Sequence, residues 1–485
     1  MSNQDTICGY QPYPNSINNI QGKTLFMAKK HADDVLIVVD GNLGFAGEDF
    51  DFEGTTCRIA HLTHENADHL RKLVPFTAPR QGLSSDRSLG AGDRLGLAGP
   101  GHIRVFQKYD VFPILAQQSI RELNLTGRTY DDVLDSVTFA VYRAGFKRGF
   151  GADGDHLKKP EELEYALRCG YSMITLDCSE HIRNDVEGMD MARVNQEYIQ
   201  DSDLEQLYLN KTFDIGEGYS LTFGLEDFKR MVLIYKNAIL FATDIYNQFI
   251  KGKPIDFEIS IDETDTPTTP LQHYFVASEL KRRGVEFATI APRFCGEFQK
   301  GVDYIGSLEQ FEKEFAVHAA IGRLFDYKIS VHSGSDKFSV FPIVGRLSRG
   351  RFHLKTAGTN WLEAVRLVAM KNPALYRELH EFALVAFKEA SQYYHVTTQI
   401  NRIPDASMLS DEELPDLFEL NDARQLIHIT YGLILTEKNP DGRFRFRDRL
   451  YDLWDKHAED YAFLLEQHIG RHLELLNSSK VDERL

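Results

Sequence analysis

The sequence contains few cysteines, and none of the five belongs to a C-x-x-C pair: Cys8, Cys57, Cys169, Cys178 and Cys295. An odd, scattered set cannot form a complete disulfide framework and does not match a cysteine-rich zinc site. No apolar run approaches the roughly 20 residues that cross a bilayer. The polar N-terminus also lacks an apolar segment of the signal-peptide type. We therefore expect a cytoplasmic protein with free thiols and no membrane partner.

Positive charge is scarce as well. The chain has 55 lysines and arginines against 72 aspartates and glutamates, a formal net charge of −17 at pH 7. Such a protein repels nucleic acid, which we do not expect as a partner. An anionic small molecule would need arginines and lysines at its binding site, because the net negative charge of the protein repels it. Two nucleotide-binding patterns are missing too, since the glycine-rich segment 90–101 has no G-x-G-x-x-G and HSGSDK (332–337) is not a Walker motif.

The length of 485 residues exceeds the roughly 250 to 300 at which a single core stops growing. We expect a central domain over residues 91–358 with parts appended at both ends. Residues 1–90 predict a small α/β region, with strands at 35–41 and 57–63 and a helix at 64–74. Residues 359–485 have helical patterns throughout. They predict a C-terminal helical extension, suited to contacts between copies in a homo-oligomer.

Residues 91–358 alternate short β-rich runs, which end in polar residues, with helical segments that end in glycine. Eight such alternations predict an α/β fold, a TIM-type (β/α)8 barrel, with an open doubly wound sheet as the alternative. The expected strands are 94–98, 112–118, 149–155, 172–177, 256–263, 286–293, 327–333 and 351–358. The interval 183–255 is too long for one helix. We interpret it as an insertion after strand 4, placed over the barrel mouth as a candidate lid.

Alternation within the strands favours the barrel. In three strands it turns polar residues toward the interior: Glu258, Ser260, Asp262, Ser330, His332, His353 and Lys355. Polar groups in a packed interior are costly unless they have partners. A barrel builds its active site from residues at the C-terminal ends of its strands. The pattern therefore predicts a functional site at that end.

Three histidines and one aspartate at predicted strand ends are candidate metal ligands: His156, Asp177, His332 and His353. Imidazoles and carboxylates from separate strands can converge on one divalent ion, as in three-ligand catalytic sites. A single histidine at a strand end is more often a core residue with its hydrogen bonds satisfied. Three of them, with Asp155 beside His156, favour a metal site. We expect a divalent cation, Zn, Mn, Co or Ni.

Two carboxylates are candidates for acid–base catalysis. Asp155 ends the strand GFGADGD, and Glu263 follows another strand in IDETDTPTTP. Carboxyl groups on opposite faces of a bound sugar can invert a stereocentre by proton transfer. The alternative is that residues of these segments cap the following helices. Five further residues are candidates for binding the substrate, with solvated salt bridges as their alternative role: Gln117, Arg293, Ser333, Lys337 and Lys355.

Six long segments between residues 90 and 350 carry a resemblance to a known family: GAGDRLGLAGPGHIR, FPILAQQSIREL, GFGADGDHLKKPEEL, FEISIDETDTPTTP, APRFCGEFQKGVDYIG and YKISVHSGSDKFSVFPIVG. They resemble the tagaturonate epimerase family, metal-dependent enzymes of bacterial hexuronate breakdown. The resemblance implies an isomerase that interconverts D-tagaturonate and D-fructuronate with a divalent cation. A small-molecule sugar acid is then the expected partner.

These two ketouronates differ at a hydroxyl-bearing carbon β to the ketone, so the carbonyl does not acidify the C–H bond directly. We expect retro-aldol cleavage, rotation of the aldehyde and re-addition through an enediolate, with direct deprotonation as the alternative. Asp155 and Glu263 would exchange the hydroxyl proton. Two other functions stay open: a metal-dependent barrel aldolase or ketose isomerase acting on another sugar acid, and a non-enzymatic sugar-acid sensor. The presence of both carboxylates disfavours the sensor.

Overall fold

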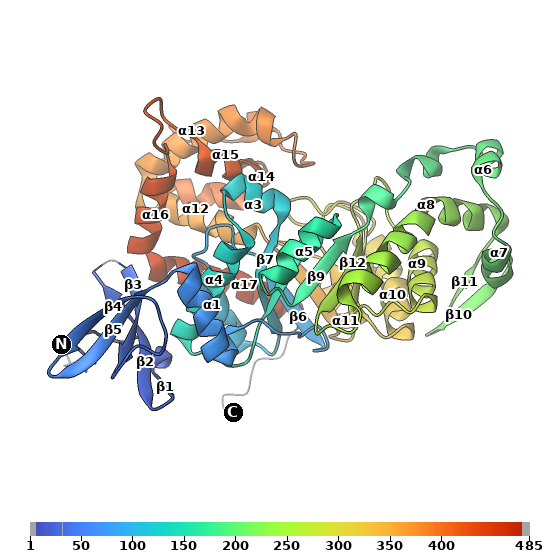
Figure 1. Cartoon of the computed structure of the whole chain (residues 1–485). Helices are drawn as coiled ribbons and strands as arrows, with labels where there is room; N and C mark the ends of the chain where they lie inside the picture. The colour runs from blue at the N-terminus through green and yellow to red at the C-terminus, as the bar shows by residue number, and fades with distance from the viewer. Residues whose placement is uncertain (1–5, 32, 478–485) are drawn as a thin grey trace.

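The central element is a closed barrel of eight parallel strands. The computed structural model describes residues 6–31 and 33–477. Within them the barrel order is β12-β13-β14-β15-β6-β7-β8-β9, closed by the pairing of β9 with β12. The strands are β6 (Arg87–Ala91), β7 (Phe112–Ser119), β8 (Gly151–Leu157), β9 (Met173–Asp177), β12 (Asp256–Ile261), β13 (Thr289–Pro292), β14 (Lys328–Val331) and β15 (Phe352–Thr356). The predicted TIM-type barrel is confirmed (Figure 1).

The first barrel strand lies earlier in the chain than predicted. The expected strand at 94–98 is wrong, because these residues form a loop in which three backbone N–H groups donate to the carboxylate of Asp93. The strand is β6, whose sequence RSLGA contains no β-branched residue. A Cβ atom at Gly90 would lie 1.6 Å from Oε1 of Gln117. The crowded barrel therefore requires a residue here that has little β propensity.

Helices follow the barrel strands and cover the outside of the barrel. They are α2 (Gly99–Lys108), α3 (Ile120–Thr126), α4 (Tyr130–Ala144), α5 (Pro160–Arg168), α8 (Leu225–Ile245), α9 (Pro270–Arg282), α10 (Leu308–Leu324) and α11 (Phe341–Leu347). Local chemistry sets their ends. Thr129 and Asp132 form a capping box at the start of α4, and Gly145 ends it with a φ of 61°. The helices and the outward strand faces share one large apolar cluster.

An antiparallel sheet precedes the barrel, in the order β1-β2-β3-β5-β4. Its strands are β1 (Asn18–Ile20), β2 (Lys23–Lys30), β3 (Asp33–Val39), β4 (Glu48–Phe52) and β5 (Thr55–His61). The helix α1 (His64–Leu73) follows β5. The sheet packs on α4, where the hydroxyl of Tyr142 donates to the carbonyl of Leu25 over 2.9 Å. The two strands and the helix expected from the sequence in this region are confirmed as β3, β5 and α1.

The part of the predicted insertion that precedes α8 forms an arm beside α8 and α9, at the end of the molecule away from the N-terminal sheet (Figure 1). Helix α8, which also falls within 183–255, covers the barrel. The elements of the arm are α6 (Met191–Glu197), α7 (Ser202–Tyr208), β10 (Thr212–Gly216) and β11 (Tyr219–Thr222). The hydroxyl of Tyr208 donates to Glu279 of α9 over 2.8 Å, and Glu217 pairs with Arg323 of α10 over 2.6 Å. These contacts fix the arm to the outer helices of the barrel.

The residues after β15 are helical, as predicted. They form α12 (Thr359–Lys371), α13 (Pro373–Ala390), α14 (Asn421–Ile429), α15 (Tyr431–Thr436), α16 (Arg447–Lys456) and α17 (Ala458–Leu475). A second apolar cluster lies among them and includes Trp361 and Trp454, whose ring centroids are 6.1 Å apart. Helix α17 packs on α2 of the barrel. Within residues 6–31 and 33–477, no helix has the length and apolar character needed to cross a membrane.

Candidate active site

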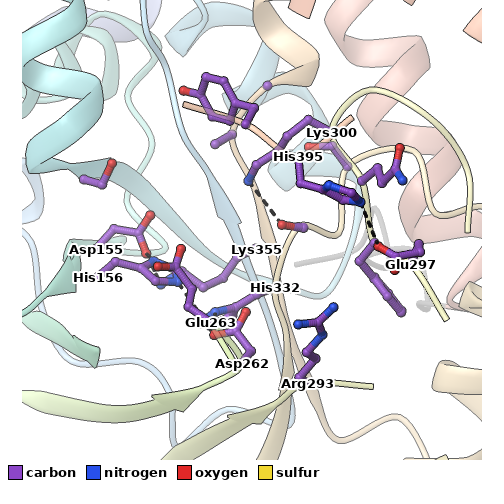
Figure 2. Close-up of a pocket in the computed structure, with 18 of the residues that line it drawn as sticks. Asp155, His156, Asp262, Glu263, Arg293, Glu297, Lys300, His332, Lys355 and His395 are labelled. Carbon is purple, nitrogen blue, oxygen red and sulfur yellow. Dashed lines mark hydrogen bonds and ion pairs between the residues drawn. The ribbon is translucent and has the colours of Figure 1, made fainter. Parts of the chain in front are cut away.

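A polar cavity of about 320 Å³ lies where the barrel strands end. Residues at the ends of β7, β8, β12, β13, β14 and β15 and in the loops that follow them line it. Figure 2 shows part of this lining, including Asp155, Asp262 and Lys355. Residues 393–395, from the segment that follows α13, complete the wall. The lining includes no residue of the insertion 183–255. The insertion, expected as a lid, contacts the loop after β12 through Asn184 and Asp265 but does not line the cavity. The helical extension supplies that part of the wall.

Three side chains in this cavity form a candidate metal group: His156 of β8, Asp262 after β12 and His332 after β14. One ligand atom from each lies within 4.8 Å of the other two. Oδ1 of Asp262 is 3.2 Å from Nδ1 of His332 and 3.8 Å from Nε2 of His156. Two imidazoles and a carboxylate suit a first-row divalent cation.

The backbone at His156 is unusual for a strand. Its φ is 55°, and the pairing of β8 with β9 shifts register between Gly154 and Leu157. A left-handed residue without glycine's freedom is strained, and such strain is concentrated at functional sites. Such an irregularity turns a side chain away from the direction that the regular alternation of a strand would give it. It places the imidazole of His156 against Asp155 and toward Asp262.

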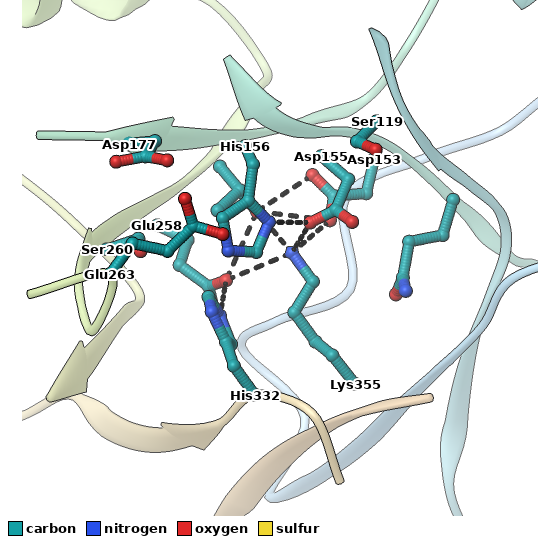
Figure 3. Close-up of polar contacts among 12 residues, drawn as sticks. Ser119, Asp153, Asp155, His156, Asp177, Glu258, Ser260, Glu263, His332 and Lys355 are labelled. Carbon is teal, nitrogen blue, oxygen red and sulfur yellow. Dashed lines mark hydrogen bonds and ion pairs between the residues drawn. The ribbon is translucent and has the colours of Figure 1, made fainter. Parts of the chain in front are cut away.

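Each histidine of the candidate metal group has one ring nitrogen on a second carboxylate. Nδ1 of His156 lies 2.7 Å from Oδ1 of Asp155, and Nε2 of His332 lies 2.7 Å from Oε1 of Glu258. The other ring nitrogen faces Asp262 in both cases. Metal-binding histidines characteristically have such an outer carboxylate, which fixes the tautomer and the ring orientation. The contacts around the group thus match those of a metal centre (Figure 3).

The buried ammonium of Lys355 joins these outer carboxylates. Its Nζ lies 2.5 Å from Asp155, 2.7 Å from Asp153 and 3.2 Å from Glu258. Burial alone would lower the pKa of Lys355, but the three carboxylates hold it well above its ordinary value. For Glu258, burial opposes ionisation while Lys355 and His332 keep its pKa well below the ordinary value. The cluster is therefore charged and internally paired.

Glu263 differs from these carboxylates because it is accessible. Its side chain is 40% exposed, and its nearest cation is Nζ of Lys158 at 3.6 Å. Burial would raise the pKa of Glu263, but the nearby His156 and other cations bring it below the ordinary value. The carboxylate lines the cavity beside the candidate metal group. It is available to accept a proton from a bound ligand.

Two of the four predicted ligands lie apart from the group. His353 pairs in register with Ser330 of β14, so it lies two residues deeper in the barrel than His332. Its Nδ1 is 3.0 Å from Oγ of Ser88, and burial lowers its pKa to about 3. Asp177 is level with Ser260, and its Oδ1 accepts from the N–H of Ser179. Neither residue is part of the His156–Asp262–His332 group.

The predicted substrate-binding residues have different surroundings. Gln117, Arg293, Ser333 and Lys355 line the cavity. Oε1 of Gln117 is buried against Gly90 without a hydrogen-bond partner among the described residues. Lys337 is not among the lining residues. It donates to the carbonyls of three residues, at 2.6–3.0 Å, and so supports the loops after β13 and β14.

A second group of possible ligands lies where the extension meets the barrel: Asp336, His468 and His472. Its members already have partners. Asp336 pairs with Arg424 over 2.7 Å, and the backbone N–H of Asp336 donates to Nε2 of His472 over 3.1 Å. His468 contacts Asp336 over 2.5 Å and Glu363 over 3.3 Å. These contacts connect the two parts of the chain and occupy the ligand atoms a metal would need.

Several residues of the site are not among the ligands and binding residues that the sequence predicts. The alternation turns Glu258 and Asp262 inward, but it does not distinguish ligands from their outer partners. Lys300, Tyr394 and His395 lie in segments without strand periodicity. Only the closure of the barrel and the packing of the extension bring them to the cavity.

A closed parallel barrel with a histidine–carboxylate group and an ionised glutamate at the strand ends defines a barrel enzyme with a candidate metal centre. The family model of tagaturonate epimerase matches residues 13–476. The chain belongs to the tagaturonate epimerase family, and the expected isomerase class, an epimerase, is confirmed.

Relatives of this family match almost the whole chain. A tagaturonate/fructuronate epimerase of Thermotoga maritima is 41% identical over 480 residues, covering 96% of this chain and 97% of its own. The native crystal structure of a fructuronate-tagaturonate epimerase from Cohnella laeviribosi is 48% identical, with a TM-score of 0.94 and 97% of each chain covered. Its complex with one glycerol is 49% identical, with a TM-score of 0.93 and 96% of each chain covered.

Proposed function

We propose that this chain interconverts D-tagaturonate and D-fructuronate, the pair named for its relatives. One observation carries the proposal: the ligand atoms of His156, Asp262 and His332 converge beside the accessible carboxyl group of Glu263, in one cavity. The cavity volume of about 320 Å³ suits a small polar ligand such as a six-carbon sugar acid. Hexuronate catabolism in the cytoplasm is the setting we propose for this activity.

We propose a divalent cation, Zn, Mn, Co or Ni, for the group of His156, Asp262 and His332. Their two imidazoles and one carboxylate are a donor set that these ions accept. The outer carboxylates Asp155 and Glu258 support this assignment, because they orient each ring toward the shared centre. When bound, the cation would act as a Lewis acid toward the substrate ketone.

The carbon that is inverted lies β to the ketone, so we propose that the neighbouring C–C bond breaks and re-forms. Glu263 accepts the proton of the hydroxyl on the inverted carbon. The oxygen electrons then form the aldehyde, and the C–C electron pair passes to the ketone fragment. After the aldehyde rotates, the bond re-forms on its other face and Glu263 returns the proton. Atoms and electrons balance, as an epimerisation requires.

Asp155 supports this reaction from behind His156. Its Oδ1 is shared between Nδ1 of His156 and Nζ of Lys355. These contacts favour a role in positioning the imidazole over the direct proton transfer expected from the sequence. Glu263 is the better proton acceptor because no hydrogen bond within the described chain engages its carboxylate.

Solvent deuterium distinguishes cleavage from direct deprotonation. In the cleavage reaction the hydrogen on the inverted carbon stays on the aldehyde fragment, so turnover in D2O leaves that position unlabelled. Deuterium at the inverted carbon after partial conversion would instead support deprotonation. The label can be located by NMR of the isolated ketouronates.

The proposed function is tested with chelator-treated enzyme and D-tagaturonate. Addition of Mn²⁺, Co²⁺, Ni²⁺ or Zn²⁺ should restore formation of D-fructuronate, resolved by chromatography. Accumulation of cleavage products would indicate an aldolase. Binding without conversion under every metal would indicate a sugar-acid sensor and contradict the proposal.

A further inference from the structure

Three cationic side chains line the cavity without a carboxylate partner among the described residues: Arg121, Arg293 and Lys300. This is notable in a chain of net charge −17, where acidic partners are abundant. Arg293 is tied to the carbonyl of Thr264, in the loop after β12. The direct contacts of Arg121 and Lys300 are with neutral groups, and Glu263 and Glu122 act on them only through space. Neither cation is engaged in an ion pair, so both can bind an anionic ligand.

Lys300 comes from the loop after β13 and is half-buried. The hydrogen bond of its Nζ is to Oγ of Ser333, over 3.1 Å. Burial, with the nearby charge of Arg121, holds the pKa of Lys300 below its ordinary value. An anion placed between the two side chains would remove this repulsion.

Arg121, near the start of α3, is positioned by an aromatic ring. The centre of its guanidinium lies 5.1 Å from the ring centroid of Tyr394. The hydroxyl of Tyr394 is 3.2 Å from that of Tyr431, and Tyr431 in turn stacks 3.8 Å from the guanidinium of Arg94. A cation–π contact orients a guanidinium without neutralising it. The helical extension therefore holds the charge of Arg121 at the cavity mouth.

Lys300 lies on a different side of the cavity from Asp155 and His156 (Figure 2). We propose that Arg121 and Lys300 bind the carboxylate of the sugar acid while its ketone end faces His156 and Asp262. Tyr394 is then a positioning residue for Arg121. The inference rests on the proposed function and adds the residues that select an acid over a neutral ketose.

This placement has a consequence for the proposed cleavage. The aldehyde fragment carries the carboxylate, whereas the ketone fragment faces the candidate metal group. An anchor on the carboxylate would retain the aldehyde fragment while its carbonyl group rotates. The same two cations thereby serve selection of the substrate and retention of the fragment.

The test compares Arg121→Met and Lys300→Met with Lys251→Met, which removes an exposed lysine outside the cavity. Each variant is assayed with D-tagaturonate and with the neutral ketose D-tagatose. We expect kcat/KM for the acid to fall roughly 10- to 100-fold in the cavity variants, mainly through KM, as expected for a lost charge-assisted hydrogen bond. Lys251→Met should retain the wild-type kcat/KM for both substrates. Tyr394→Leu should raise KM for the acid to a smaller degree.

Binding provides a second readout that does not require turnover. D-gluconate carries a carboxylate, and D-glucitol is its neutral counterpart. Calorimetry should detect gluconate binding to wild type and to Lys251→Met, with roughly 10-fold or greater weakening in Arg121→Met and Lys300→Met. No gluconate binding to wild type, or binding unaffected by both cavity variants, would overturn the inference. Absence of ketouronate turnover in wild type, with this binding pattern intact, would contradict only the proposed function.

Discussion

Nζ of Lys355 and Oδ1 of Asp155 are 2.5 Å apart, and the same oxygen lies 2.7 Å from Nδ1 of His156. The ammonium thus contacts an outer carboxylate of the candidate metal group. Its contact with Glu258 extends the same relationship to His332. Lys355 balances carboxylate charge that would otherwise be buried without compensation.

Replacing Lys355 with Met should weaken metal binding by roughly 10- to 100-fold, because the carboxylates that orient both imidazoles lose their common partner. The affinity can be measured by competition with a chromophoric chelator. Lys337→Met is the matched control, since Lys337 is also a buried lysine but contacts only backbone carbonyls. Equal metal affinity in wild type and Lys355→Met would contradict this positioning role.

His353, a predicted ligand that lies apart from the metal group, can be distinguished from the ligands within it. His156→Ala and His332→Ala should abolish metal-dependent turnover. His353→Gln should retain the bound metal, because His353 lies deeper in the barrel beside Ser88. Metal content and activity of the purified variants decide between the sets. Loss of metal from His353→Gln in a folded protein would favour the ligand set expected from the sequence.

Glu263→Gln should lower kcat by roughly 10²- to 10⁴-fold, the usual range for loss of a general acid–base group. Metal content should stay unchanged, because Glu263 is outside the His156–Asp262–His332 group. Asp265→Asn removes an exposed carboxylate from the same loop and should be nearly silent. Comparable kcat values for wild type and Glu263→Gln would rule out the proposed proton acceptor.

His468 should stabilise the junction of barrel and extension in a pH-dependent way. Burial opposes its charge, but Asp336 and Glu363 raise its pKa overall, with Arg424 and His472 also facing it. Because the folded pKa is raised, this stabilisation is fully present below the unfolded pKa of about 6.5. It is lost as the pH rises through the folded value.

The unfolding midpoint in urea should therefore separate wild type from His468→Gln more at pH 6 than at pH 9. Tryptophan fluorescence is a suitable probe, because both tryptophans of the chain, Trp361 and Trp454, are buried in the helical extension. A difference between the two proteins that is independent of pH would indicate a packing contribution only.

Much of the barrel could be predicted from the sequence because seven of its strands combine β-rich runs with polar ends. The eighth, β6, could not, since close packing at Gly90 requires small residues that lack β propensity. The same limit applies to the site. His332 and His353 follow the same alternation, but the pairing of Ser330 with His353 places them at different depths. Strand stagger is a property of the closed barrel and is not encoded in the spacing along one strand.

The part of the cavity wall that the helical extension supplies could not be predicted from the sequence either. Tyr394 follows α13 and reaches the barrel only because the extension packs on it, through contacts such as that of Tyr431 with Arg94. The positive charges at the mouth could have been sought from the overall charge of −17. The fold alone determines that the direct contacts of these charges are with neutral groups, which leaves the charges available to bind an anionic ligand.

The most direct test of the account measures divalent metal content and D-tagaturonate turnover in the same samples of wild type and Asp262→Ala. Both proteins are stripped with a chelator, reloaded with Mn²⁺, Co²⁺, Ni²⁺ or Zn²⁺ and freed of excess ion. We predict one bound metal ion per chain and D-fructuronate formation in wild type, with loss of both in Asp262→Ala. Equal metal content in the two proteins, or conversion by metal-free wild type, would contradict a cation site built from His156, Asp262 and His332.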